Sequence, residues 1–178
     1  MTDALQTFAS GLAAAWGPLT SELVAEACGR LARLTAASPD EPWLADLRRD
    51  APAGRELCRD PDHGFVLMAH TEQAGLLRPP HDHGRAWVVY AVQSGEIEIR
   101  TYARIDGPDG ARLVRRDATV LRPGLALAYL PGDIHDTRCL SDTALLFRFT
   151  ERDLRVEDKV ERRMTRYVDR GGVWRPAA

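Results

Sequence analysis

The sequence predicts an all-β domain that carries a helical segment at its N-terminus. Over residues 64–150, short or alternating apolar runs are separated by turn signals rich in Gly, Pro and Asp, which is the pattern of an antiparallel barrel. The stretch before it is rich in Ala and Leu at helical spacing. With 178 residues, 44% hydrophobic and 28% charged, the chain is long enough for one well-filled core. We therefore expect a single domain over residues 1–178.

The N-terminal segment, residues 1–52, is expected to form two or three helices. Its apolar side chains recur at helical spacing, as they do at Leu23, Ala27, Leu31 and Leu34. Gly17-Pro18 precedes this run and Ser38-Pro39 follows it, and both pairs are typical of helix boundaries. Because Ala and Leu faces of this kind usually pack, we expect the helices to cover one side of the barrel.

The barrel core is expected over residues 55–155 and a C-terminal extension over residues 156–178. One stretch of the core alternates apolar and charged residues, which predicts one buried and one solvated strand face: Ile97, Ile99 and Thr101 against Glu96, Glu98 and Arg100. Residues 151–169 are dense in charge and fit either a final strand or a short polar helix.

Three of the five histidines lie in two short motifs framed by Pro and Gly. His81 and His83 stand in Pro-Pro-His-Asp-His-Gly, residues 79–84, and His135 ends Pro-Gly-Asp-Ile-His, residues 131–135. Side chains two residues apart leave the same face of a strand, so His81 and His83 can reach one ion. Neutral imidazoles suit iron, zinc, copper and nickel, and three of them leave coordination positions open for a substrate. The remaining histidines, His63 and His70, are expected to be ordinary loop or strand residues.

The two motifs resemble those of the cupin superfamily, G-x5-H-x-H-x(3,4)-E-x6-G and G-x5-P-x-G-x2-H-x3-N. The first motif is matched by Gly75, His81, His83 and Gly95, and the second is nearly matched by Gly124, Pro131, Gly132 and His135. The resemblance implies a double-stranded β-helix, the jelly-roll barrel, with the N-terminal helical segment packed on it.

The departures from these motifs narrow the resemblance. The glutamate position holds Trp87 by the shorter spacing or Val88 by the longer one, and the asparagine position holds Cys139. The implied ligand set is therefore three histidines, which looks like the thiol dioxygenases, the cysteine dioxygenase group and its relatives. That family implies Fe(II), although imidazoles also accept Zn, Ni, Mn or Cu. The implied reaction oxidises a small thiol-bearing acid with dioxygen to its sulfinic acid.

The same resemblance implies where a substrate carboxylate would bind. In cysteine dioxygenases an arginine ahead of the first metal histidine binds the substrate carboxylate. Arg59 lies at the corresponding place in this sequence, and the alternative is that it is an ordinary surface arginine. A guanidinium can hold a carboxylate with two parallel hydrogen bonds. Arg148 lies between apolar neighbours, so it faces solvent or, facing inward, is a second anchor. Trp87 would wall the pocket in place of the missing glutamate, or serve as a core aromatic.

Three function classes stay open, and the sequence assigns no catalytic residue. They are a dioxygenase of a small thiol acid, another cupin metalloenzyme with a non-thiol substrate, and a non-catalytic small-molecule-binding cupin. The three histidines and Arg59 favour the first class. The Ser-x-His-x-Tyr group of many bacterial thiol dioxygenases would fall on Leu146, Arg148 and Thr150, and its loss favours the second. Retention of all three ligands counts against the third.

Charge and composition argue against other partners. A net charge of −2 without a basic run gives no footprint for nucleic acid. No basic leader region and no apolar run of membrane-spanning length occur, so we expect no membrane partner and a cytoplasmic location. Three cysteines without a C-x-x-C spacing, Cys28, Cys58 and Cys139, are expected to be free thiols. The expected partners are a small molecule and dioxygen, and a homodimer is a candidate assembly because cupin sheets often pair.

Overall fold

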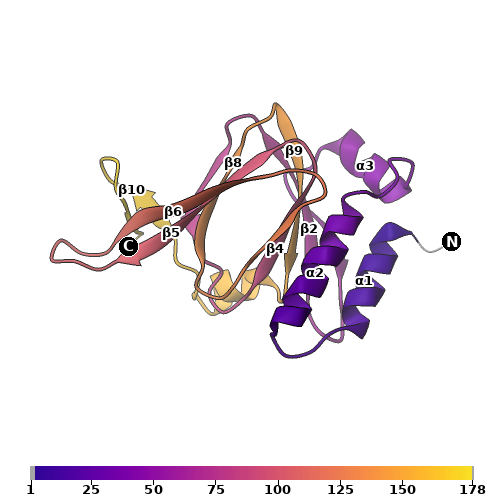
Figure 1. The fold of residues 1–178 in the computed structure, drawn as a ribbon, viewed down its shortest axis with the longest axis horizontal. Coiled ribbons are helices and arrows are strands. Elements are labelled where there is room, and N and C mark those ends of the chain that lie inside the picture. The colour runs from indigo at the N-terminus through magenta and orange to yellow at the C-terminus, as the bar shows by residue number, and fades with distance from the viewer. Residues whose placement is uncertain (1–2, 178) are drawn as a thin grey trace.

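The computed structural model describes residues 3–177 and shows an antiparallel barrel with three helices on one side (Figure 1). The helices come first: α1 (Ala4–Ala14), α2 (Ser21–Leu34) and α3 (Pro42–Asp50). The barrel strands follow in the order β1 (Arg55–Arg59), β2 (Val66–Gln73), β3 (Leu77–His81), β4 (Val88–Ser94), β5 (Ile97–Ile105), β6 (Arg112–Leu121), β7 (Ala126–Tyr129), β8 (Ile134–Cys139) and β9 (Thr143–Thr150). The chain ends with a π-helical turn, η1 (Val156–Val160), and the hairpin β10 (Tyr167–Asp169) and β11 (Trp174–Pro176).

The strand order is that of a jelly roll. One sheet runs β1-β2-β9-β4-β7 and the other β3-β8-β5-β6, and the neighbouring strands are antiparallel. Each sheet thus interleaves strands from the two halves of the barrel sequence, as the two Greek keys of a double-sheet jelly roll do. The predicted fold class, a double-stranded β-helix with an N-terminal helical segment packed on it, is confirmed.

The helices cover the outer face of the five-stranded sheet. Helix α2 begins where the hydroxyl of Thr20 accepts a hydrogen bond from the Leu23 N–H at 3.2 Å, which satisfies one of the free donors of the first turn. The predicted apolar stripe of this helix is buried. It belongs to one core cluster with alternate residues of three strands: Leu67, Ala69, Val89, Ala91, Phe147 and Phe149.

A second core lies between the two sheets. Ile97 and Ile99 are each 1% exposed within it, which confirms the predicted buried face of β5. On the other face of this stretch, Glu96 pairs with Arg122 at 2.8 Å. Arg100 is only partly exposed, because its guanidinium donates two hydrogen bonds to the buried carboxylate of Asp136 at 2.9 and 2.7 Å.

The C-terminal extension returns to the four-stranded sheet. Tyr167 of β10 is buried in a cluster with Tyr102, Leu113 and Ile134. The backbone of Arg166 forms an isolated antiparallel β-bridge with His81 of β3. The charged stretch that fitted a strand or a helix therefore contains both a π-helical turn and a short strand. The three cysteines are free, as predicted. No helix in the part of the chain that the structure describes combines the length and apolarity needed to span a bilayer.

Candidate metal centre

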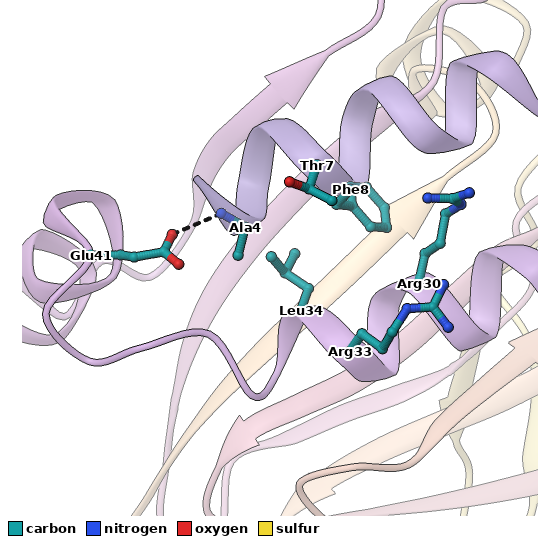
Figure 2. A pocket seen from close by; sticks show the side chains of 7 residues that line it. All are labelled: Ala4, Thr7, Phe8, Arg30, Arg33, Leu34 and Glu41. Carbon is teal, nitrogen blue, oxygen red and sulfur yellow. Dashed lines mark hydrogen bonds between the residues drawn. The ribbon is translucent and has the colours of Figure 1, made fainter. Parts of the chain in front are cut away.

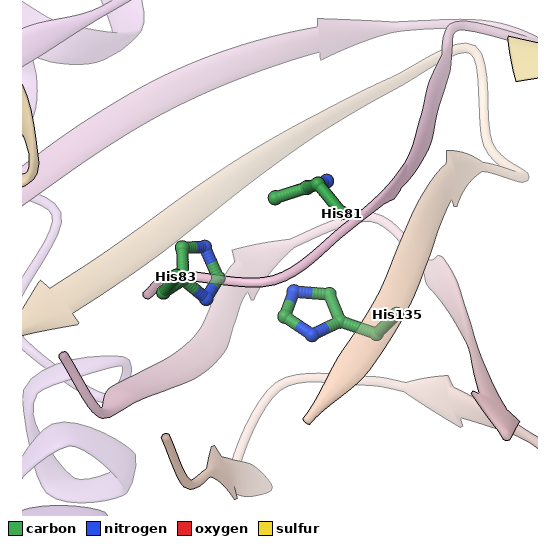
Figure 3. A group of neighbouring side chains, drawn as sticks. All are labelled: His81, His83 and His135. Carbon is green, nitrogen blue, oxygen red and sulfur yellow. The ribbon is translucent and has the colours of Figure 1, made fainter. Parts of the chain in front are cut away.

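His81, His83 and His135 converge, although they come from distant segments (Figure 3). His81 ends β3 and lies opposite His135 on β8 in antiparallel register, and His83 follows in the loop to β4. The ring centroids are 4.9, 5.1 and 5.0 Å apart in the three pairs. One ring nitrogen from each residue lies within 4.8 Å of the others. The three predicted ligands thus form one nearly equilateral cluster.

These imidazoles have the protonation state that metal ligation requires. His135 is 0% exposed, and neither of its ring nitrogens has a hydrogen-bond partner among residues 3–177. Burial, together with the neighbouring imidazoles, holds the pKa of His83 and of His135 well below the ordinary value. The His81 Nδ1 donates a hydrogen bond to the Pro79 carbonyl at 2.9 Å, which leaves the lone pair on Nε2. Neutral, buried nitrogen donors fit a divalent first-row metal.

Two tyrosines that the sequence analysis missed border the cluster. The Tyr90 hydroxyl lies 3.4 Å from His83 Nε2, and the Tyr129 ring lies 4.2 Å from the His135 ring between centroids. Burial raises the pKa of both phenols, so each is neutral at physiological pH. Alternation along β4 places Tyr90 on one face with Val88 and Val92, but the sequence does not show which face turns inward.

The structure places Trp87 away from the histidines, which corrects its predicted role as a wall of the metal pocket. A turn closed by the Ala86 N–H to the His83 carbonyl at 3.1 Å interrupts the strand between the motif and β4. Strand parity therefore does not carry over from His83 to Trp87. The indole is 2% exposed and packs on the helix side, with its ring 6.5 Å from Trp16 and 5.2 Å from Phe149 between centroids.

Arg148 faces the barrel interior, the second of the two alternatives that the sequence left open. It lies on β9 between Met68 of β2 and Tyr90 of β4, its register partners. Its Nε is buried and has no hydrogen-bond partner among the described residues. Burying a polar N–H without a partner costs free energy, so a bound anion here would satisfy a donor that the protein leaves free.

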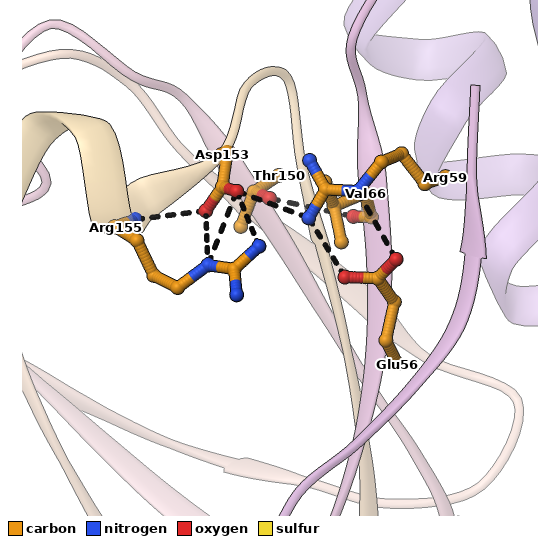
Figure 4. A network of polar contacts seen from close by, with 6 residues as sticks. All are labelled: Glu56, Arg59, Val66, Thr150, Asp153 and Arg155. Atoms are coloured by element: carbon orange, nitrogen blue, oxygen red, sulfur yellow. Dashed lines mark hydrogen bonds and ion pairs between the residues drawn. The ribbon is translucent and has the colours of Figure 1, made fainter. Parts of the chain in front are cut away.

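Arg59 lies in a different cavity, which corrects the prediction that it anchors a carboxylate beside the metal. Its guanidinium donates to Glu56 at 3.1 and 2.7 Å and pairs with Asp153 at 3.0 Å (Figure 4). Hydrogen bonds from Arg155, together with the charges of Arg155 and Arg59, lower the pKa of Asp153 to about 2. This cavity of about 200 Å³ contains no histidine in its lining, although Arg148 borders it too. Arg59 is therefore occupied by two carboxylates of its own chain.

A larger cavity, of about 490 Å³, opens beside the histidines. His81, His83 and Arg148 line it, together with Arg78 and Arg166. Arg78 donates to the buried Glu72 at 2.9 and 2.7 Å, and Arg166 donates to Asp158 at 2.6 Å. Part of the wall comes from the C-terminal extension: Met164, Tyr167, Val168 and Ala177. The cavity combines imidazole nitrogens with cationic groups and therefore suits an anionic small molecule.

A further cavity, of about 370 Å³, lies among the helices (Figure 2). Two of its charged groups have partners within the chain: Glu41 accepts hydrogen bonds from the Ala4 N–H at 3.0 Å and the Trp43 indole at 2.5 Å, and Arg30 pairs with Glu26 at 2.6 Å. Phe8 and Leu34 complete much of the lining. This arrangement is that of a helix packing boundary, and we assign no chemistry to it.

Comparisons with known proteins find structural likenesses at low sequence identity. No family model matches the chain, and none of the curated proteins matches it. Among solved structures it is similar to KdgF from Halomonas sp. (19% identity, 56% of this chain and 77% of that one, TM-score 0.43). It is also similar to the Cnp3 cupin domain of Schizosaccharomyces pombe (13% identity, 61% of this chain and 69% of that one, TM-score 0.44). A third similar structure is oxalate oxidase in complex with the substrate analogue glycolate (21% identity, 49% of this chain and 41% of that one, TM-score 0.39).

These likenesses concern the fold, and the strand order carries the fold assignment. The chain spans less than half the length of the oxalate oxidase chain. What the molecule itself displays is a double-sheet jelly roll with a three-histidine cluster of the kind that takes a divalent metal.

Proposed function

We propose that this chain is a metal-dependent cupin dioxygenase that oxidises a small thiol-bearing acid to its sulfinic acid, with Fe(II) held by His81, His83 and His135. The observation that carries the proposal is an all-imidazole cluster that shares a cavity with Arg148, a half-buried arginine whose buried Nε–H has no partner among the described residues. Three neutral ligands leave coordination positions for a reactant, and the arginine offers a site for its carboxylate.

Each residue near the cluster has a role that follows from its position. Iron, when bound, supplies the one-electron and dioxygen chemistry that side chains lack. Arg148 holds the far-end carboxylate, which fixes the thiol end toward the histidines and removes orientational freedom before the reaction. Tyr90, 3.4 Å from His83, can donate a hydrogen bond to a polar group at the reacting end. The buried setting of His83 and His135 keeps bulk water away.

The reaction balances without a further reductant. A thiol and one dioxygen molecule give one sulfinic acid: both oxygen atoms bond to sulfur, and the thiol proton ends on the sulfinic acid or in solvent. The four electrons that sulfur gives up reduce the two oxygen atoms. The expected partners are therefore a small thiol acid and dioxygen. A reducing cytoplasm is the proposed compartment, since all three cysteines are free thiols.

The test is dioxygen consumption by protein loaded anaerobically with ferrous iron. Cysteine, 3-mercaptopropionate and cysteamine are compared, with His135→Ala as the loss-of-ligand variant and His63→Ala as the matched control, since His63 lies in an exposed turn. We expect turnover with a thiol carboxylate, none in His135→Ala together with the loss of bound iron, and full turnover in His63→Ala. Stoichiometric iron with every thiol inert would reject the thiol reaction.

The same site acting on a non-thiol carboxylate is the second candidate. It is favoured by the residues that replace the Ser-x-His-x-Tyr group, namely Leu146, Arg148 and Thr150. Small carboxylates without a thiol, assayed with the same iron-loaded protein, separate it from the first candidate. Tight binding of a carboxylate without turnover would instead indicate a binding protein.

A further inference from the structure

The loop that carries His81 and His83 is held from outside the barrel by the C-terminal extension. Asp82, between the two histidines, accepts hydrogen bonds through Oδ1 from the Gly84 N–H at 2.9 Å and the Thr165 N–H at 3.0 Å. Its own N–H donates to the Thr165 carbonyl at 3.1 Å. The residue that points away from the metal site thus connects the motif to residues more than 80 positions later.

A buried glutamate holds the next part of the same loop. Glu157 of η1 is 1% exposed, and its Oε2 accepts a hydrogen bond from the Arg85 N–H at 3.1 Å. Its Oε1 accepts from Arg152 at 3.2 Å and lies 3.6 Å from Arg163. The carboxylate is therefore fixed by two guanidinium groups while it binds the backbone two residues after His83.

Gly84 is shaped to this contact. Its φ of +63° is a conformation that side chains rarely adopt, and a Cβ there would lie 2.6 Å from Glu157 Oε2 and 3.0 Å from Arg163 Cβ. The glycine of His-Asp-His-Gly thus permits both the turn and the close approach of the glutamate. None of the three clustered histidines lies on the C-terminal extension, so its tight fit on this loop calls for a role.

We propose that Glu157 is a positioning residue of the metal site, which fixes the loop that presents His81 and His83 and so sets the affinity for the metal. This inference rests on the proposed metal function. A histidine that must wait for its loop to order binds metal more weakly than one already in place, because the ordering cost is subtracted from the binding free energy. Groups that orient metal ligands change metal affinity by about 10- to 100-fold when they are removed.

The experiment is a Co²⁺ titration of the metal-free protein, followed by its visible absorption, with thermal unfolding of the same samples. The variants are Glu157→Ala and Glu157→Gln, and Glu161→Ala is the matched control, since Glu161 lies in the same segment but is exposed and pairs with Arg163 at 2.7 Å. Glutamine can still accept the Arg85 N–H, so it separates the loop contact from the charge.

We expect Glu157→Ala to raise the Co²⁺ dissociation constant at least about tenfold, Glu157→Gln to recover most of the affinity, and Glu161→Ala to match the wild type. A merely structural role would lower the unfolding temperature and leave the dissociation constant of the folded protein unchanged, and that result would overturn the inference. If Glu157→Ala does not fold, Glu157→Gln and Asp82→Ala are read by the same criterion. A wild-type protein that takes up neither Co²⁺ nor Fe²⁺ overturns the metal site itself and this inference with it.

Discussion

The two faces of the five-stranded sheet are built from the same strands and carry opposite chemistry. On β9, Phe147 and Phe149 turn toward the helices and are both 0% exposed in an entirely apolar cluster. Arg148 lies between them in sequence and turns into the barrel, toward Tyr90. One face therefore has the composition of a core, and the other brings charged and titratable groups to the interior of the barrel.

The difference shows which groups the protein keeps for a ligand. The helix-facing cluster contains no polar group in need of a partner. On the interior face, Arg148 Nε and His70 Nε2 are buried and have no partner among residues 3–177. Both ring nitrogens of His135, on β8 of the opposite sheet and 5.4 Å from the Tyr90 ring between centroids, are in the same condition. Buried polar groups are normally satisfied, and each exception costs free energy. Arg148, one of these exceptions, lines the cavity that His81 and His83 also line, which indicates that this part of the face is shaped for binding rather than for stability.

Phe149→Ala is the variant from which we expect the largest effect, a loss of stability on the helix-facing side. It removes a fully buried aromatic from the helix-facing cluster, so we expect the free energy of unfolding of the metal-free protein to fall by about 3–5 kcal/mol. Co²⁺ affinity of the folded protein should stay unchanged. Urea unfolding and metal titration measure the two effects, with Leu140→Ala as a control because Leu140 is 45% exposed. A large loss of metal affinity in folded Phe149→Ala would show that the two faces are not independent.

The sequence predicts the helix-facing side and the ligands well because both depend on local pattern. The stripe through Leu23 and Leu31 follows helical periodicity. The two-residue spacing of His81 and His83 predicts that they converge, as they do, although His83 lies in the loop just after β3. The pairing of His81 with His135 comes from sheet register, which the sequence alone does not display. Here the family resemblance supplied what periodicity could not.

The substrate side of the site is less predictable, since it depends on irregular backbone. The turn from His83 to Ala86 reverses the parity of β4, and so exchanges Trp87 for Tyr90 on the inner face. Arg59 pairs with Asp153 and so lies outside the site. Asp153 follows β9, far along the sequence from Arg59, and the two residues come together only in the folded chain. Contacts of this kind cannot be deduced from spacing.

Arg148→Met tests the interior face with a medium effect. Losing a charge-assisted hydrogen bond costs about 1.5–3 kcal/mol, so KM for a thiol carboxylate should rise about 10- to 100-fold. The unfolding temperature should hold or rise, because a buried donor without a partner is removed. Cysteamine, which has no carboxylate, should be unaffected, and Arg59→Met should leave KM unchanged. Equal KM changes for both arginine variants would contradict the assignment of the anchor to Arg148.

The smallest expected effect is a loss of stability at acidic pH. It comes from His70, a histidine on the interior face that is not one of the three clustered histidines. The His70 Nδ1 donates to the Ala53 carbonyl at 3.0 Å, and burial, helped by the charge of Arg148, lowers the pKa of His70 to about 4. In the unfolded chain the same imidazole takes up a proton below its ordinary pKa of 6.5. The unfolded state therefore binds more protons between those two values, and stability must fall as the pH drops from about 6.5 toward 4.

His70→Gln should flatten this part of the pH dependence. The amide can still donate to the Ala53 carbonyl but does not titrate, so metal-free His70→Gln should lose less stability than the wild type between pH 7 and pH 5. We expect the two falls in unfolding temperature to differ by at least about 3 °C, which is roughly what 1 kcal/mol produces in a chain of this size. His63→Gln, in an exposed turn, should follow the wild type. Parallel curves for His70→Gln and the wild type would mean that the interior face hydrates His70, so that only the histidines at the metal cluster lie in a low-polarity environment.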